Sequence, residues 1–351
     1  VKQLKEDSAA YKVTNVEAIN TENAEFSPVF FNKNQAVLFA SNRRNTAARN
    51  KTFAWDDSYF IDMYTSNKKD SLKFESTVPM AKTISSTYHD GPASLSADEK
   101  TVYLTKSNII VKKIKGVAVN VINLKLYILT KDAEGKLSKP ENFPFNSNDY
   151  SVGHATVTKD GKRLYFVSDM PGGYGQTDLY VSENVNGQWQ KPENLGQAIN
   201  TEGREMFPYV HEDGTLFFST DGRAGLGGLD LYFTVPAMDA YFEPQSLGYP
   251  INSNFDDFGF ALKNDLKTGY FSSNRTGGKG KDDIYFFRSK EPLMGVTLSG
   301  IVFDESNKEI INNAWVYLLD NNKLVIDSTK VNAKAEYMFP INDPSKEYFV
   351  G

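Results

Sequence analysis

Short runs of aromatic and β-branched residues alternate with polar, glycine-containing turns along most of the chain. Three segments show this pattern most clearly, at Arg163–Glu183, Thr215–Val235 and Thr268–Arg288. Each has a short apolar run, a glycine-rich bend and a second run in which apolar and polar positions alternate. A period of two is typical of strands with one buried face, so each segment predicts a β-hairpin.

The bends of these hairpins share one chemistry, in which glycines are followed by an aspartate, an aliphatic residue and a tyrosine. The recurring residues are Asp178, Asp230 and Asp283 with Tyr180, Tyr232 and Tyr285. A phosphate-binding loop would lead into a helix, whereas strand patterns follow here. A calcium β-roll would repeat the motif in tandem, with its aspartate one residue earlier. We therefore expect the glycines to supply positive φ angles and the aspartates to accept hydrogen bonds from loop N–H groups.

The hairpin belongs to a longer repeat. A further strand precedes each hairpin, and a turn of the Ile-Asn-Thr type precedes that strand, as in Gln197–Pro208 and Glu17–Pro28. One position recurs as Glu25, Asp90, Ser151, Glu205 and Asp257, with spacings of 65, 61, 54 and 52 residues. Each unit then has four strands, and a single unit cannot bury both faces of its sheet. We predict an all-β fold in which residues 13–290 form a five-bladed β-propeller.

The two ends of this region complement each other. The last unit stops after its third strand, at Asp283–Phe287, while Val13–Ala18 has the pattern of a strand with no unit before it. We predict that this N-terminal strand completes the last blade and closes the ring, which protects two strand edges. Residues 1–12 would then be a linker from a preceding domain.

The glycine–aspartate pattern stops near Gly295. Residues 294–351 alternate apolar and polar positions between short turns, which is typical of a small antiparallel sandwich. Because a strand pattern continues to the last residues, we expect this sandwich to be incomplete in this chain.

Both regions resemble known domain families. Tyr88–Asn108 and the paired Ile-Asn-Thr and Asp-Leu-Tyr motifs resemble WD-like propeller repeats of the TolB type, and "VTLSGIVFD" with "NNAWVYLLD" resembles the carboxypeptidase regulatory-like domain. In this order the two resemble PorE-like, OmpA-family multidomain envelope proteins of Bacteroidetes-type bacteria. That resemblance implies a transthyretin-like class for the small, incomplete β-sandwich. It also implies a periplasmic, outer-membrane-associated protein of a type IX secretion-like system, with a peptidoglycan-binding domain outside this chain. The second unit departs from the pattern, since Lys125 replaces the aspartate and the glycine loop is missing.

Composition and the absence of certain motifs limit the partners and reactions that the chain could have. The chain has 351 residues, a net charge of -5 and no cysteine. The acidic balance disfavours nucleic acid as a partner, and the lack of cysteine excludes disulfides and thiolate metal sites. No apolar run is long enough for a transmembrane helix, and neither Gly-x-Ser-x-Gly nor His-Glu-x-x-His is present. We therefore expect no enzymatic activity and no cofactor.

Two groups of residues are candidates for a metal site. His89, His154 and His211 lie at or near first strands, which line the channel of a propeller, but at different offsets from the recurring position. The recurring acids could ring the channel mouth around a cation, or each could bond the backbone of its own turn. We favour turn bonding, and so no metal, for the acids Glu25, Asp90, Glu205 and Asp257.

Two long insertions indicate an interaction surface. Units one and two insert residues 43–60 and 108–123 between their second and third strands, and the second insertion has the pattern of an extra hairpin. Long loops on a rigid scaffold often carry function, and Arg and Trp are favoured interface anchors. The candidate partner-binding residues are Arg43, Arg44, Arg49, Phe53, Trp55, Lys112, Lys113 and Lys115.

These observations favour a non-enzymatic scaffold or interaction module of the cell envelope, linking an outer-membrane complex to peptidoglycan. The family resemblance implies an outer-membrane β-barrel partner of the PorP/SprF type, or another envelope protein. The alternative is a carbohydrate-active or peptidase-associated propeller enzyme, because propellers also host enzymes.

Overall fold

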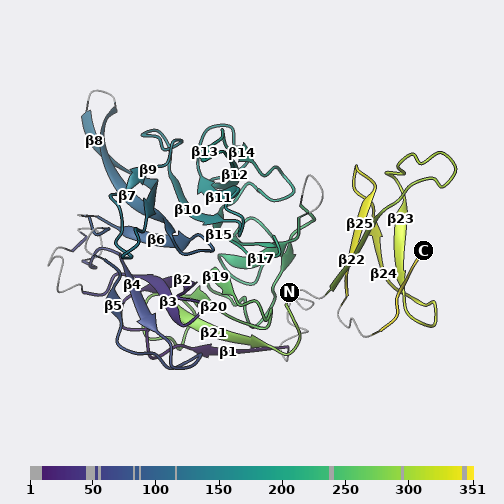
Figure 1. Cartoon of the computed structure of the whole chain (residues 1–351), viewed down its shortest axis with the longest axis horizontal. Helices are drawn as coiled ribbons and strands as arrows, with labels where there is room; N and C mark the ends of the chain where they lie inside the picture. Colours follow the sequence, from purple (N-terminus) through teal and green to yellow (C-terminus); the bar gives the residue numbers. More distant parts are fainter. Residues whose placement is uncertain are drawn as a thin grey trace. The chain divides into compact units, whose positions relative to one another are not determined.

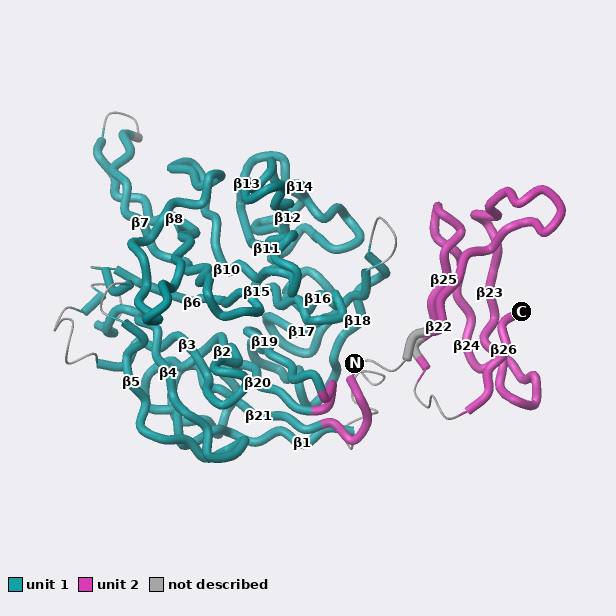
Figure 2. Tube along the Cα trace, viewed as in Figure 1, with its two compact units in different colours: residues 1–264, 268–288 teal, residues 265–267, 289–351 magenta. Residues whose placement is uncertain are grey.

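The structure is a computed structural model that describes residues 10–44, 52–53, 57–81, 84–86, 88–114, 117–236, 241–293, 296–341 and 346–351. The helices and strands assigned in these ranges are all β-strands, with no helix among them, which confirms the prediction of an all-β chain. The strands form two compact units, coloured teal and magenta in Figure 2. Unit 1 comprises residues 1–264 and 268–288, and unit 2 comprises residues 265–267 and 289–351.

Unit 1 repeats one sheet pattern, in which consecutive strands pair in chain order (Figure 1). The first sheet contains β2 (Glu25–Phe31), β3 (Ala36–Ser41), β4 (Asp62–Asn67) and β5 (Val78–Pro79). The second contains β6 (Asp90–Leu95), β7 (Thr101–Ile114), β8 (Val117–Thr130) and β9 (Glu141–Asn142). In the third, β10 (Val152–Val157), β11 (Arg163–Ser168) and β12 (Asp178–Val185) are followed by β13 (Gln188–Trp189) and β14 (Glu193–Asn194), which both pair with β12. The fourth contains β15 (Glu205–Val210), β16 (Leu216–Thr220), β17 (Asp230–Thr234) and β18 (Gln245–Ser246).

The fifth sheet joins the two ends of unit 1. Its order is β1-β21-β20-β19, with β1 (Tyr11–Asn15), β19 (Asp257–Leu262), β20 (Thr268–Ser273) and β21 (Asp283–Ser289). The strand nearest the N-terminus thus lies beside the third strand of the last repeat. It occupies Tyr11–Asn15 rather than Val13–Ala18, because the chain turns after Asn15 and the Ile19 N–H bonds the Val16 carbonyl.

The core of unit 1 lies between neighbouring sheets. The first strands contact one another in the cyclic order β2, β6, β10, β15, β19 and back to β2. One apolar cluster joins the first sheet to the fifth through Phe39, Tyr64, Tyr270 and Ile284. Each sheet is therefore covered by its neighbours, which is how these short, apolar strands bury both faces.

The predicted insertion in the second unit is a continuation of its own strands. β7 and β8 have 14 residues each and stay paired from Thr101↔Thr130 to Ile114↔Val117. The extra hairpin is thus the outer half of one long hairpin, which projects from the rest of unit 1 at the upper left of Figure 1.

Unit 2 is built from two small sheets. One pairs β22 (Val296–Ile301) with β25 (Glu336–Ile341), and the other has the order β24 (Val325–Lys330), β23 (Trp315–Leu319), β26 (Phe349–Val350). Its core consists of Val316, Leu318, Val331, Phe339 and Ile341.

Candidate functional site

The first strand of every sheet in unit 1 is interrupted by a bulge at the same level. The pairing with the second strand shifts between Phe26 and Val29, Asp90 and Ala93, Gly153 and Thr156, Met206 and Tyr209, and Phe258 and Ala261. A bulge re-aims the side chains near it, and bulges are common beside functional sites. The five bulges lie on strands that follow one another around unit 1.

The bulges hold non-glycine residues in an unfavourable backbone conformation. Ser27, His154 and Phe207 have φ angles of 51°, 49° and 50°, and Gly259 has 61° at the equivalent position of β19. A positive φ costs an L-residue free energy and persists only where the surroundings enforce it. Proline follows Ser27 and Phe207, and it leaves no N–H to be satisfied at the bulge.

The bulges and the strand residues after them line one partly open pocket of about 120 Å³. A cavity of about 150 Å³ can hold a benzene-sized ring, so this space suits a single small ring. None of the described residues that line it is Asp, Glu, Lys or Arg. The lining comprises Ser27–Val29, Pro92–Leu95, His154–Val157, Phe207–Val210, Gly259 and Phe260.

Three buried polar atoms in this lining have no hydrogen-bond partner in the described part of the chain. They are the hydroxyl oxygens of Ser27 and Ser94 and the Nδ1 atom of His154. Buried polar groups almost always have partners, because leaving one unsatisfied costs about 1–3 kcal/mol. All three belong to residues that line the same pocket, so a ligand or water that reached them could supply the missing bonds.

His154 is held in place from both sides. Its backbone N–H donates to Thr105 Oγ1 at 2.8 Å, and its ring stacks on Phe207 with centroids 4.2 Å apart and planes 15° apart. Burial lowers the pKa of His154 to about 4, because the charged imidazolium would lose its hydration. The imidazole is therefore neutral at physiological pH and can accept as well as donate a hydrogen bond.

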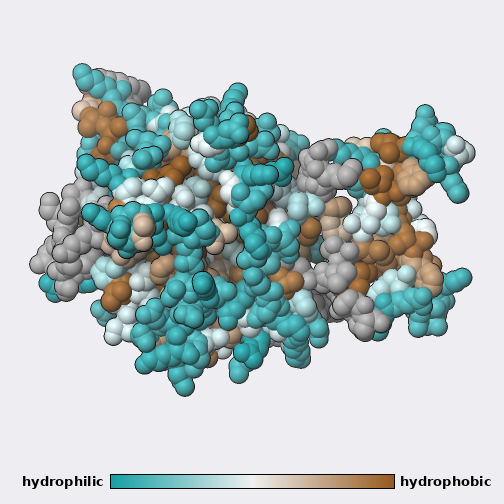
Figure 3. Space-filling model, viewed as in Figure 1, coloured by the Kyte–Doolittle hydropathy of each residue, from teal (hydrophilic) through white to brown (hydrophobic). Residues whose placement is uncertain are grey.

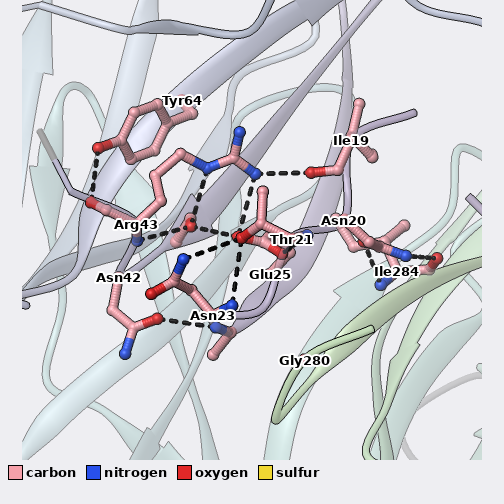
Figure 4. A network of polar contacts seen from close by, with 12 residues as sticks. Ile19, Asn20, Thr21, Asn23, Glu25, Asn42, Arg43, Tyr64, Gly280 and Ile284 are labelled. Carbon is pink, nitrogen blue, oxygen red and sulfur yellow. Dashed lines mark hydrogen bonds and ion pairs between the residues drawn. The ribbon is translucent and has the colours of Figure 1, made fainter. Parts of the chain in front are cut away.

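The recurring acids lie apart from this pocket, at the beginning of the first strands. Figure 4 shows Glu25, whose carboxylate accepts bonds from the Thr21 N–H at 2.6 Å, Thr21 Oγ1 at 2.9 Å and Ser41 Oγ at 2.6 Å. Arg43 Nη2 lies 3.0 Å from the same carboxylate and donates to the Ile19 carbonyl at 2.6 Å. The carboxylate thus ties its turn to the second strand.

The other recurring acids repeat this arrangement. Glu205 accepts from the N–H and the hydroxyl of Thr201, and Asp257 from the N–H and hydroxyl of Ser253. Asp257 also pairs with Arg275, and Asp90 pairs with Lys106 at 2.9 Å. Burial raises the pKa values of Asp90, Glu205 and Asp257, while their cations and donors oppose that shift. In the third sheet the equivalent residue is Val152 rather than Ser151, because Val152 pairs with Ser168 as Glu25 pairs with Ser41.

The glycine loops join neighbouring sheets. Asp178 accepts from the N–H groups of Tyr174 and Gly175, as Asp230 does from Leu226 and Gly227. Asp283 bonds Lys279 and Gly280 in the same way. A Cβ atom on Gly175, Gly227 or Gly280 would overlap backbone oxygens of the next sheet's turn. The tyrosines of the motif, Tyr180, Tyr232 and Tyr285, are buried in the sheets.

Sequence reasoning gave no role to the asparagine of the Ile-Asn-Thr turn. Its side-chain amide bonds both the N–H and the carbonyl of one residue on the preceding third strand. The pairs are Asn20 with Ile284, Asn146 with Leu126, Asn200 with Leu179 and Asn252 with Leu231. The recurrence of this asparagine was the signal, because an amide side chain can imitate one rung of a β-ladder.

The three histidines lie in different environments. His89 Nδ1 accepts from the Ile61 N–H at 3.2 Å, and His211 Nδ1 lies 3.1 Å from Asp213 Oδ1. Only His154 belongs to the pocket lining. Among the described residues, no group of three or more His, Asp or Glu is placed to hold a metal ion.

The predicted partner-binding residues are scattered. Arg43 is engaged with Glu25 and lies over the rings of Phe39 and Tyr64, and Phe53 packs against Phe60 and His89. Arg44 follows β3, and Lys112 and Lys113 lie on β7, with Lys112 Nζ 3.1 Å from Asp149. Arg49, Trp55 and Lys115 lie outside the described residues.

Comparisons with known proteins find likenesses of structure alone. No protein-family model and no curated protein matches the chain. A family 117 glycoside hydrolase from Zobellia galactanivorans is 12% identical, with a TM-score of 0.46 and 81% of this chain and 90% of that chain covered. An α-L-arabinofuranosidase from Podospora anserina in complex with cellotriose is 12% identical, with a TM-score of 0.45 and coverage of 79% and 93%. Both are β-propeller-type proteins.

A further similar structure is a puromycin-hydrolyzing peptidase from Mycobacterium tuberculosis, 13% identical with a TM-score of 0.38. The alignment covers 74% of this chain, which spans only 44% of that peptidase. The named activities are enzymatic, so the main prediction of a non-enzymatic envelope scaffold is corrected: the comparisons favour the predicted alternative, a propeller enzyme, over that scaffold. At these identities and TM-scores they assign no particular activity to this chain. No helix among the described residues is both long and apolar enough to cross a membrane.

Proposed function

We propose that unit 1 is a five-bladed β-propeller, closed by β1, which binds carbohydrate in its central channel. The observation that carries the proposal is that Ser27, Ser94 and His154, which line one pocket, each have a buried polar atom without a partner in the described part of the chain. The five sheets, the cyclic contacts of their first strands and the pairing of β1 with β21 support the blade count.

The pocket chemistry favours an uncharged, hydroxylated ring. Charged ligands would lose hydration without gaining an ion pair, because no described lining residue is a carboxylate, lysine or arginine. Two hydroxyls and a neutral imidazole can each donate or accept, which matches the hydroxyl groups of a sugar. Apolar side chains in the lining, among them Val29, Ala93 and Val157, supply apolar surface beside these polar groups.

The same lining favours binding over hydrolysis. Glycosidases generally use a pair of carboxyl groups on opposite sides of the bond that breaks. None of the described residues that line this pocket has a carboxyl group, and the buried acids are engaged with their own turns. We therefore propose a carbohydrate-binding module, which shares the substrate class of the predicted carbohydrate-active enzyme but differs from it in lacking hydrolysis.

Titration calorimetry with methyl glycosides of glucose, galactose, mannose and arabinose tests this function. We expect saturable binding of at least one glycoside, and an affinity about tenfold lower for Ser94→Ala, which removes one hydrogen-bonding group. Ser147→Ala is the matched control, since Ser147 lies in a turn outside the pocket lining. No saturable binding by the unmodified chain, or equal affinity of Ser94→Ala, would show that water alone satisfies these atoms.

The transthyretin-like class of unit 2, the periplasmic location and the outer-membrane partner stay predictions. They rest on the sequence patterns and the family resemblance.

A further inference from the structure

The outer half of the β7–β8 hairpin stands beyond its sheet. β6 pairs with β7 only as far as Lys106, and β9 pairs with β8 only at Tyr127 and Ile128. Residues 108–114 and 117–123 therefore form a two-stranded ribbon, whose strands pair only with each other among the described residues. A two-stranded ribbon has two free edges, and each is a template for a further strand.

The hydrogen bonds at the base of β8 show which of its N–H groups lie on the outer edge. Leu124, Leu126 and Thr130 donate away from β7, to Ser151 Oγ at 3.2 Å, Asn146 Oδ1 at 2.9 Å and Ser138 Oγ at 3.0 Å. The β7–β8 register has no bulge, and N–H directions alternate along a strand. Ala118, Asn120 and Ile122 therefore direct their N–H groups along the free edge of β8.

This edge lacks the usual protection. Residues 117–123 contain no charged side chain, whereas the opposite strand carries Lys112 and Lys113. Val117, Val119 and Ile122 are 64%, 38% and 42% exposed, and Val111 on β7 is 68% exposed. Figure 3 shows hydrophobic (brown) surface on this projecting hairpin. Exposed edges are normally blunted by lysine, proline or bulges, so an apolar, regular edge indicates an occupant.

Charge and hydrogen bonding indicate which kind of partner fits this edge: a second copy of the chain, a bilayer or an acidic strand. The ribbon carries Lys112 and Lys113 and no acid, so two copies of it would repel each other. A bilayer would leave the edge N–H groups without partners in hydrocarbon. An acidic segment in extended conformation would pair with the edge, and the side chain of Lys112 on β7 already holds an acid, Asp149. We propose that the β8 edge at residues 117–123 is a docking site for an acidic β-strand of another protein.

A synthetic acidic peptide tests this docking site. The probe has about ten residues, alternates glutamate with valine and threonine, and is compared with a twin in which lysine replaces glutamate. We expect the full chain to bind the acidic probe and not its twin, by fluorescence anisotropy. Asn120→Pro removes one outward N–H and should weaken binding about tenfold, whereas Asn120→Ala retains that N–H and should bind normally.

Hydrogen exchange gives the second measurement. Bound probe should slow exchange of the amides of Ala118 and Ile122, with Val119 and Val121 as inward-facing controls. Equal binding by Asn120→Pro and Asn120→Ala, or no added protection of these amides, would overturn the proposal. Self-association through this edge, seen by sedimentation, would also overturn it. So would binding to phosphatidylglycerol vesicles that is equally strong for Asn120→Pro and the unmodified chain. None of these outcomes depends on a sugar in the channel.

Discussion

Ser27 combines two features that each cost stability. Its φ angle is 51°, and its buried hydroxyl has no partner in the described part of the chain. Glycine tolerates this backbone conformation and removes the hydroxyl, so Ser27→Gly should raise the free energy of unfolding by about 1–2 kcal/mol. Urea unfolding measures the change, and the same variant should bind methyl glycosides more weakly.

Ser41→Gly is the matched control for this variant. The Ser41 hydroxyl donates to Glu25 at 2.6 Å, and the residue lies inside β3. The same substitution should therefore lower stability there by about 1–3 kcal/mol. If Ser27→Gly also destabilised the chain, Ser27 would be an ordinary packed residue rather than one kept for a ligand.

Asp282 predicts a pH dependence of stability. Burial, with repulsion from Asp256 and Asp283, raises its pKa to about 6. The folded chain then binds more protons than the unfolded chain between about pH 4 and 6, so this residue's contribution is lost as pH rises through 6. At pH 7 Asp282→Asn should be more stable by about 1–2 kcal/mol, measured by urea unfolding across this range.

Asp160 gives the opposite sign and serves as the control. Hydrogen bonds from the Thr158 hydroxyl and the Lys162 N–H lower its pKa. Its contribution is present at neutral pH and is lost as pH falls, so Asp160→Asn should lower stability at pH 7. Equal pH profiles of Asp282→Asn and the unmodified chain would show that Asp282 is solvated.

At the scale of elements, the glycine loops act as contacts between sheets. Gly280 packs against the Asn23 and Thr21 carbonyls of the turn before β2, so a methyl group there would push the fifth sheet from the first. Gly280→Ala should cost about 3 kcal/mol. Gly277 lies in the same loop with a φ of 88° and open space around it, so Gly277→Ala should cost only about 1 kcal/mol. Thermal unfolding compares the two, and equal losses would mean that this loop is not a packed contact.

Local sequence patterns predicted the hairpins, because each hairpin loop is stabilised by residues close to it in the sequence. In each loop an aspartate accepts hydrogen bonds from the N–H groups of the glycine bend, and a tyrosine is buried in the strand that follows. The bulges were not predictable, because a shift of register depends on two strands together. The proline three residues after Glu25 and Glu205 was an available sign of them. The prediction that Ser151 occupies the repeat position was wrong, because the strand register places Val152 there. An apolar residue at this position does not continue the pattern of acids that guided the alignment.

At the scale of the whole molecule, the candidate site forms only where the first strands of all five sheets come together. Its residues come from five first strands that span Ser27 to Phe260, and no spacing along the chain brings Ser27, Ser94 and His154 together. The number of repeats predicted a ring, but only the arrangement of the sheets shows which side chains converge. The polar clusters visible in the sequence bond the turns and strands of unit 1 to one another, while the pocket is formed by residues without a common motif.

Methyl NMR of the isotope-labelled chain during glycoside titration tests the central claim most directly. The account predicts saturable shifts of the Val29, Ala93 and Val157 methyl groups, which line the pocket, and their loss in Ser94→Ala. The methyl groups of Val117 and Val119 on the projecting hairpin should not move. Shifts confined to methyl groups outside the channel, or none for any glycoside, would contradict the account.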